Sequence, residues 1–226
     1  MFEESDVKVS KNIFKIKTPS VVEHDKDLAA LIDYWQRMRR GQDVPLRTEI
    51  DPRGIEGLLS NAFIAEKVTP GLARMRVAGT HLSNLLGMEI RGMPVSSLIE
   101  PDHRNNLSDA IVELFERPAR LQIELTSKGS YNAPPMQGTM LILPLRSDLG
   151  DISRALGCLV TTGEIGKGPR RFEITDIQIN PVKIPNGVRA QQFSEAQVPY
   201  TAQDEPTEDR PLGPSERPYL RLIHSS

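Results

Sequence analysis

The order in which helical and strand periods follow one another between residues 25 and 162 constrains the fold of this chain most strongly. Apolar residues recur at intervals of three and four over residues 25–40, which predicts an amphipathic helix with Trp35 in its apolar stripe. A second, shorter helix is expected to begin at Asp51 and Pro52, because Asp caps helices well and Pro suits the first helical position. This part of the chain therefore opens with helices.

Strand periods come next. Residues 61–68 and 72–77 flank a Pro-Gly turn and predict a β-hairpin. Residues 79–92 contain several glycines and predict only brief helical turns, whereas residues 101–117 predict a long helix that Pro118 ends. Three more strands are predicted at residues 120–126, 136–145 and 153–162.

This order indicates the fold class. Hairpin-type connections within each group of strands favour an antiparallel sheet, and the helices are segregated between the two groups. The sequence therefore predicts an α+β fold, with a five-stranded antiparallel sheet and a helical lead-in before it.

Composition excludes several classes of protein. Lys and Arg total 28 and Asp and Glu total 30, so the net charge of −2 gives no reason to expect nucleic acid or an anionic membrane surface as partner. A single cysteine excludes an intramolecular disulfide framework and any site with several cysteine ligands. The sequence shows neither a secretory signal nor an apolar run of about 18 residues, so we expect a cytoplasmic protein without membrane insertion.

Proline usage divides the chain. Residues 181–226 hold 7 of the 18 prolines and show no hydrophobic period, which predicts a disordered tail. Within it, residues 217–223 alternate apolar and basic side chains. This segment is either a frayed end or a strand that docks on a sheet edge. Residues 7–17 partly alternate in the same way and are read as a short strand or arm. The expected divisions are an N-terminal arm (1–24), the helical lead-in (25–60), the main domain (61–164), a connecting segment (165–180) and the tail (181–226).

Motif searches give no catalytic or metal site. The glycines of residues 163–168 lack the spacing of a phosphate-binding loop and are expected to mark the exit from the last strand. No nucleophile elbow occurs, and no two histidines have the i, i+4 spacing of a zinc site. Those histidines are His24, His81, His103 and His224.

Two segments carry a resemblance to a known family. Gly-Met-Glu-Ile-Arg-Gly at residues 87–92 resembles the segment that follows the first hairpin of PAS domains. Leu-Ile-Glu-Pro-Asp-His-Arg at residues 98–104 resembles the entry to the long PAS helix, although Glu100 and His103 depart from the usual residues there. The resemblance implies a PAS sheet of order 2-1-5-4-3 with helices over one face.

The lead-in sharpens this resemblance. Residues 31–59, with Tyr34-Trp35 and Asp51-Pro52, resemble the helical lead-in of bacterial single-PAS proteins that carry no kinase, cyclase or DNA-binding domain. This subfamily implies a non-enzymatic sensory or interaction module that regulates signalling through protein contacts. A sensor kinase is the kind of partner that such a role implies.

A PAS fold would place a mostly apolar pocket between sheet and helices. The residues that would line it are equally explained as core, because hydrophobic spacing does not separate a filled core from a pocket. These residues are Met75, Val77, Leu85, Leu98, Leu107, Ile111, Leu114, Leu125 and Leu143.

The resemblance also bears on cofactors. Some PAS domains bind haem through a histidine near the long helix, which makes His103 the candidate ligand. Flavin-binding PAS domains carry a reactive cysteine on a short helix, whereas Cys158 lies in an apolar strand, so flavin photochemistry is not expected.

The apolar stripe around Trp35 could pack either against its own sheet or against the same helix of a second subunit, and we expect a homodimer through these helices. Two other functions stay open at this point. One is a ligand-free adaptor that works through its C-terminal tail, and the other is a small-molecule-binding carrier or enzyme.

Overall fold

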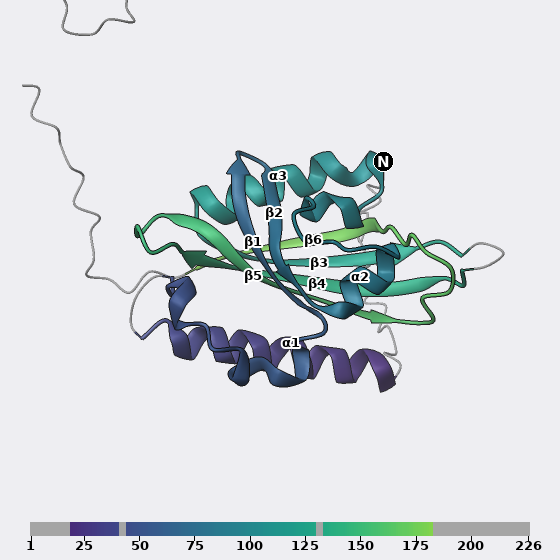
Figure 1. Ribbon diagram of the computed structural model, residues 1–226, viewed down its shortest axis with the longest axis horizontal. Coiled ribbons are helices and arrows are strands. Elements are labelled where there is room, and N and C mark those ends of the chain that lie inside the picture. The colour runs from purple at the N-terminus through teal and green to yellow at the C-terminus, as the bar shows by residue number, and fades with distance from the viewer. Residues whose placement is uncertain (1–18, 41–43, 130–132, 183–226) are drawn as a thin grey trace, which may run out of the picture. The chain divides into compact units, whose positions relative to one another are not determined.

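The computed structural model describes residues 19–40, 44–129 and 133–182, and side chains from residue 25 onward (Figure 1). Its α-helices are α1 (Pro19–Met38), α2 (Thr80–Leu86) and α3 (Arg104–Glu116). Short 3₁₀ helices are η1 (Arg47–Glu49), η2 (Pro52–Leu58), η3 (Val95–Leu98) and η4 (Pro101–His103). The strands are β1 (Ala62–Thr69), β2 (Leu72–Ala78), β3 (Ala119–Ser127), β4 (Met136–Arg146), β5 (Ile152–Thr162) and β6 (Glu173–Pro181).

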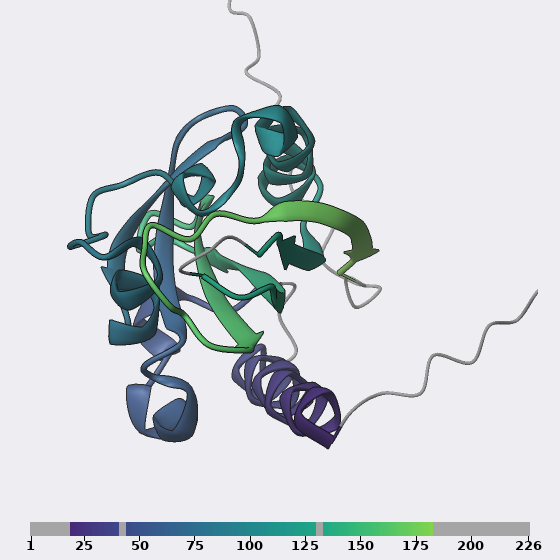
Figure 2. The same ribbon diagram turned by 90° about the vertical axis from the view of Figure 1, so that its right-hand side faces the viewer.

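All neighbouring strands of the sheet are antiparallel, in the order β2-β1-β5-β4-β3-β6 (Figure 2). The first five strands stand in the predicted order 2-1-5-4-3, which confirms the α+β fold with a helical lead-in. The predicted helix at residues 25–40 begins earlier, at Pro19, where a proline needs no hydrogen-bonding partner for its nitrogen. The short helix after Asp51 is a 3₁₀ helix, and the Asp51 carboxylate accepts a hydrogen bond from the Arg53 N–H at 3.0 Å.

The sixth strand corrects the sequence prediction, which took residues 165–180 as a connecting segment. β6 pairs with β3, and a bulge interrupts the register, because Glu124 lies opposite Asp176 while Leu125 lies opposite Ile174. The extra residue, Thr175, breaks the alternation of apolar and polar side chains that reveals a strand in a sequence.

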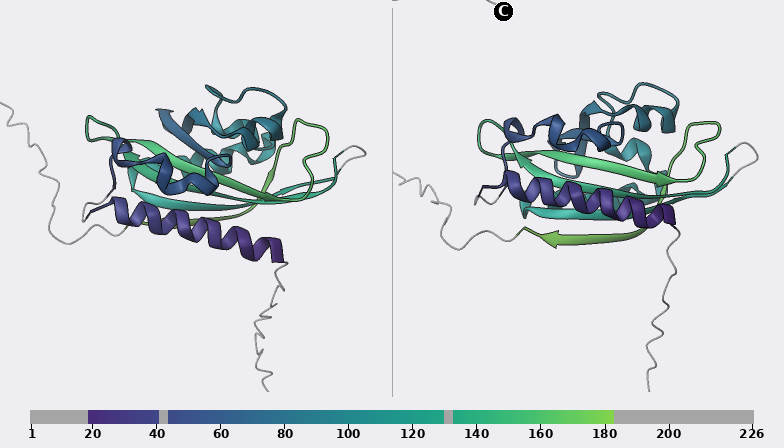
Figure 3. Two further views of the ribbon diagram at one scale, coloured as in Figure 1. Left: turned by 60° about the horizontal axis from the view of Figure 1, so that its bottom comes forward. Right: turned by 90° about the horizontal axis from the view of Figure 1, so that it is seen from below.

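Apolar clusters cover both faces of the sheet (Figure 3). The interior cluster lies under α2, η3 and α3. It includes Phe63, Met75, Leu82, Leu85, Leu98, Leu107, Ile111, Leu114, Met136, Met140 and Phe172. The lead-in cluster lies on the opposite face, under α1 and η2. It includes Leu28, Leu31, Tyr34, Trp35, Ile55, Leu58, Leu141, Leu143, Leu156 and Cys158.

Trp35 anchors α1 to its own sheet. Its side chain is 1% exposed, and its indole N–H donates a hydrogen bond to the Pro144 carbonyl of β4 at 2.9 Å. The Tyr34 hydroxyl beside it donates to the Asp51 carbonyl at 3.0 Å and accepts from the Asp51 N–H at 2.7 Å. Of the two predicted packing partners, the apolar stripe of α1 therefore packs against its own sheet. A homodimer would need another surface than the one around Trp35, and the oligomeric state itself stays a prediction.

Several predictions lie outside the described residues. These are the strand or arm at residues 7–17, the docking segment at 217–223 and the disordered tail apart from Pro181 and Val182. Within the described ranges, no helix is long and apolar enough to cross a membrane.

Candidate functional site

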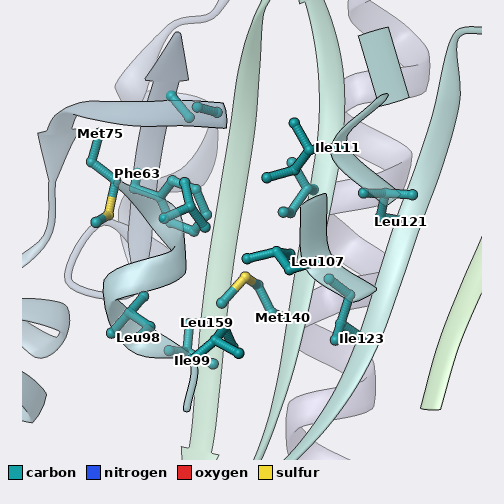
Figure 4. Close-up of a cluster of buried hydrophobic side chains, with 14 of the residues drawn as sticks. Phe63, Met75, Leu98, Ile99, Leu107, Ile111, Leu121, Ile123, Met140 and Leu159 are labelled. Carbon is teal, nitrogen blue, oxygen red and sulfur yellow. The ribbon is translucent and has the colours of Figure 1, made fainter. Parts of the chain in front are cut away.

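The interior cluster is the candidate site, and Figure 4 shows part of it. Its side chains come from α2, from η3, from α3 and from the sheet. It contains seven of the nine predicted lining residues. These are Met75, Leu85, Leu98, Leu107, Ile111, Leu114 and Leu125.

Two predicted lining residues lie elsewhere. Val77 is 55% exposed, because a bulge between the pairs Ile64–Val77 and Ala65–Met75 turns it away from the face that Met75 occupies. Leu143 belongs to the lead-in cluster, on the opposite face of the sheet. Neither residue can contribute to a pocket that the other seven form.

The interior is closely filled. No side chain of the cluster exposes more than 5% of its surface, and Met75, Leu98 and Leu107 expose none. A residue beside an internal cavity of water size would show accessible surface. A ligand would therefore have to displace side chains, for which flexible methionines such as Met136 and Met140 are suited.

A strap at residues 163–172 lies against this cluster at one end. Its backbone bonds to the neighbouring elements, with the Arg170 N–H donating to the Leu85 carbonyl at 2.7 Å and the Phe172 N–H donating to the Leu98 carbonyl at 2.9 Å. The Glu100 N–H in turn donates to the Phe172 carbonyl at 2.9 Å, and the Phe172 ring is fully buried in the cluster. The strap thus ties α2 to the entry of α3.

Arg170 is a buried cation within this strap, 3% exposed. Its guanidinium donates to the carbonyl oxygens of Pro134 and Glu164, while its Nε finds no acceptor among the described residues. Burial of a charge needs such bonds to offset lost hydration. We assign Arg170 the role of fixing the strap to the connection between β3 and β4.

A half-open cleft of about 230 Å³ lies beside the interior, between the β1–β2 turn and the first half of α3. Leu107 and Ile111 of the predicted lining residues border it, so it adjoins the interior cluster. Polar groups of Ser96, Arg104 and Ser108 line it as well. The cleft therefore lies next to the candidate site.

The chain matches the family model described as PAS domain over residues 23–160, which is more than half of its length. The strand order β2-β1-β5-β4-β3 and the helices between β2 and β3 agree with that match. The chain belongs to the PAS domain family. None of the curated proteins compared with it matches.

Solved structures resemble this PAS domain at low identity. A light-oxygen-voltage domain studied with a flavin analogue is 18% identical, with a TM-score of 0.38, covering 50% of this chain and 84% of that one. The dark structure of the Aureochrome1 LOV photoreceptor is 16% identical, with a TM-score of 0.36, covering 49% and 80%. An RNA-binding light-oxygen-voltage receptor is 15% identical, with a TM-score of 0.34, covering 51% and 35%. These similarities are too weak to indicate that this chain binds flavin, senses light or binds RNA.

The cysteine of this PAS domain does not suit adduct chemistry with a flavin. Cys158 points into the lead-in cluster, on the face of the sheet opposite to the interior. Burial raises the pKa of its thiol to about 12, with a further contribution from the Asp27 charge, so almost no thiolate exists at neutral pH.

His81 and His103 are the histidines whose side chains the structure describes. The His81 ring nitrogen Nε2 hydrogen-bonds the Thr161 hydroxyl at 3.0 Å. His103 is half-buried where η4 meets α3, and its role as a haem ligand stays a prediction. In the described part of the chain, no three His, Cys, Asp or Glu side chains gather as a metal site.

Arg170 and Glu66 are two polar residues whose structural roles the sequence does not reveal. The Glu66 carboxylate contacts Arg154 of β5 at 2.6 Å and accepts a hydrogen bond from Arg76 of β2, so it links three strands. Partial burial acts to raise the pKa of Glu66, but the Arg76 hydrogen bond and the Arg154 charge outweigh it and hold this pKa below its usual value. Only the strand register, which the sequence does not state, brings these residues together.

Proposed function

We propose that this PAS domain is a non-enzymatic sensory module that regulates a signalling protein through direct contacts. Its lead-in resembles that of bacterial single-PAS proteins, for which a sensor kinase is the expected kind of partner. A small apolar ligand in the interior cluster would bias those contacts by favouring one of two arrangements of the sheet and the lead-in.

The observation that carries this proposal is the shared use of β4 and β5. Met140 and Ile142 of β4 belong to the interior cluster, while Leu141 and Leu143 between and beside them belong to the lead-in cluster. β5 alternates in the same way. Because both clusters rest on the same two strands, a change of volume in the interior must displace the backbone on which α1 packs.

The cleft beside α3 supports an entry route. Leu107 and Ile111 border the cleft and also belong to the interior cluster, so a rotation of these side chains would open the cleft toward the interior. Met75 and Met140 then offer unbranched side chains that repack around a guest.

Native mass spectrometry and an absorption spectrum of the freshly purified full chain test the ligand. We expect a bound mass that is released on denaturation and that a Leu107→Trp variant loses. The matched control is Leu149→Trp, at a side chain 94% exposed in a turn, which should keep it. The mass of the bare chain, with no absorption beyond that of the protein, contradicts gating by a resident ligand.

The close packing of the interior favours one alternative, a ligand-free adaptor whose C-terminal tail recruits partners. Deleting residues 183–226 discriminates between the two, since it leaves β6 and Val182 in place. Loss of partner capture with an unchanged circular dichroism spectrum supports the adaptor. Capture that survives the deletion supports contacts made by the PAS domain itself.

We also propose a homodimer, with an interface other than the stripe around Trp35. The outer side of α1 is exposed and polar, with Lys26, Asp33 and Arg37 on it. Sedimentation velocity should give a dimer at roughly tens of micromolar chain, since association follows mass action. A monomer at that concentration contradicts this part of the proposal.

A further inference from the structure

The outer edge of β6 is open along its middle. The Val182 N–H donates to the Pro118 carbonyl of the neighbouring chain segment at 2.8 Å. Every second residue of β6 before it, including Gln178 and Asp176, therefore also directs its backbone N–H and C=O toward β3. The backbone groups of Ile177 and Ile179 therefore point away from the sheet. Among the described residues no strand pairs with this edge, because β6 is the last strand in the sheet order.

The ends of this edge are protected. The bulge at Thr175 bends the strand at one end, and Pro181 has no N–H to offer at the other. Between them, Ile177 and Ile179 leave two donors and two acceptors for an incoming strand. Such an open edge is a ready template for strand addition.

The two faces at this edge differ in what they require of an incoming strand. On the face of the interior cluster, Ile177 is partly buried and Ile179 is 43% exposed. On the other face, Glu124 and Asp176 are partners in the register. The Glu124 carboxylate accepts hydrogen bonds from Gln122 and Thr139, and the Asp176 carboxylate accepts one from Gln178. No described Lys or Arg forms an ion pair with either carboxylate. Like charges in this arrangement destabilise a sheet. The edge therefore favours a strand that alternates apolar and cationic side chains.

We propose that residues 7–17 of this chain, Val-Lys-Val-Ser-Lys-Asn-Ile-Phe-Lys-Ile-Lys, bind this edge as a seventh strand. They hold four lysines and no acidic residue. Their pairs Val7/Val9 and Phe14/Ile16 have the two-residue spacing of Ile177/Ile179, with lysines next to them in sequence. Apolar side chains would extend the interior face while a lysine neutralises the paired carboxylates.

The position of α1 sets the direction of this strand. Figure 3 shows α1 and β6 beginning at the same end of the sheet, and residues 7–17 end just before the first residue of α1. A segment that meets α1 at that end and lies along β6 runs antiparallel to it. Once bound, it covers the edge, so a partner that adds a strand there has to displace it.

Hydrogen exchange of single amides in the full chain, followed by nuclear magnetic resonance, tests this proposal. The Ile177 and Ile179 amides should exchange at least about tenfold more slowly than exposed amides, because carbonyl groups of the seventh strand accept their hydrogen bonds. Changing the four lysines to Glu should remove this protection, and changing them to Arg should keep it. Unchanged exchange of the β3 amides shows that each variant is folded.

Three results would overturn the proposal. Rapid exchange of Ile177 and Ile179 in the unmodified chain shows that the edge is uncovered. Protection that rises with protein concentration assigns the edge to a second copy. Protection that survives the change to Glu assigns it to a different strand.

Discussion

Removal of the Trp35 side chain should cost this domain a large part of its stability. The indole is 1% exposed in the lead-in cluster and donates its N–H to the Pro144 carbonyl at 2.9 Å. Truncation of a buried Trp to Ala costs about 3–5 kcal/mol. Because domains are stable by only about 5–15 kcal/mol, a Trp35→Ala variant should be marginally folded.

A Trp35→Phe variant isolates the hydrogen bond. It keeps most of the apolar contact and leaves the Pro144 carbonyl without its donor, which costs about 1–3 kcal/mol for a buried polar group. Urea unfolding followed by far-ultraviolet circular dichroism measures both changes, with Leu149→Ala as the control at an exposed turn.

If both Trp35 variants unfold within about 0.5 kcal/mol of the unmodified protein, the range of surface substitutions, then the indole does not anchor α1 to the sheet. A loss of stability that depends on protein concentration would also contradict this anchoring. That result would place Trp35 between subunits rather than on its own sheet.

Other predictions concern the sheet. Cys158 should resist iodoacetamide in native protein at pH 8 and react in urea, because burial raises its thiol pKa; rapid native labelling would contradict this. Glu66→Gln should lower the free energy of unfolding at pH 7, and this difference should vanish as the pH falls through the lowered pKa of Glu66. An equal loss at pH 7 and below that pKa would show that the charge of Glu66 is not its cause. Gly157→Ala should destabilise by about 1–3 kcal/mol, since a Cβ there overlaps the Phe63 ring, and a Phe63→Leu background should recover part of the loss in urea unfolding.

The sequence predicts most of the fold because its periods are unambiguous. The helix at residues 101–117, bounded by prolines, and the three strands after it need no knowledge of tertiary contacts. The failures have a shared physical cause. The bulges at Thr175 and beside Val77 each insert a residue that the alternation of side chains does not reveal, which hid β6 and misplaced Val77.

The candidate site was predicted less completely. β4 is apolar on both faces, so its period does not show that Leu143 faces α1 rather than the interior. Arg170 sits beside Arg171 in the sequence, and only the fold buries the first and exposes the second. Whether the interior is a filled core or a pocket depends on packing, which apolar spacing does not specify.

A change of packing in the interior should reach α1 through β4 and β5, which both clusters share. Trp35 is the only tryptophan, so the protein has one indole N–H resonance, and that group bonds to β4. A Leu114→Ala variant opens space in the interior from α3, and Leu149→Ala changes an exposed turn. The indole resonance should shift in the Leu114→Ala variant and stay in place in the Leu149→Ala variant. An unmoved resonance in a folded Leu114→Ala protein would show that the interior and α1 are not coupled.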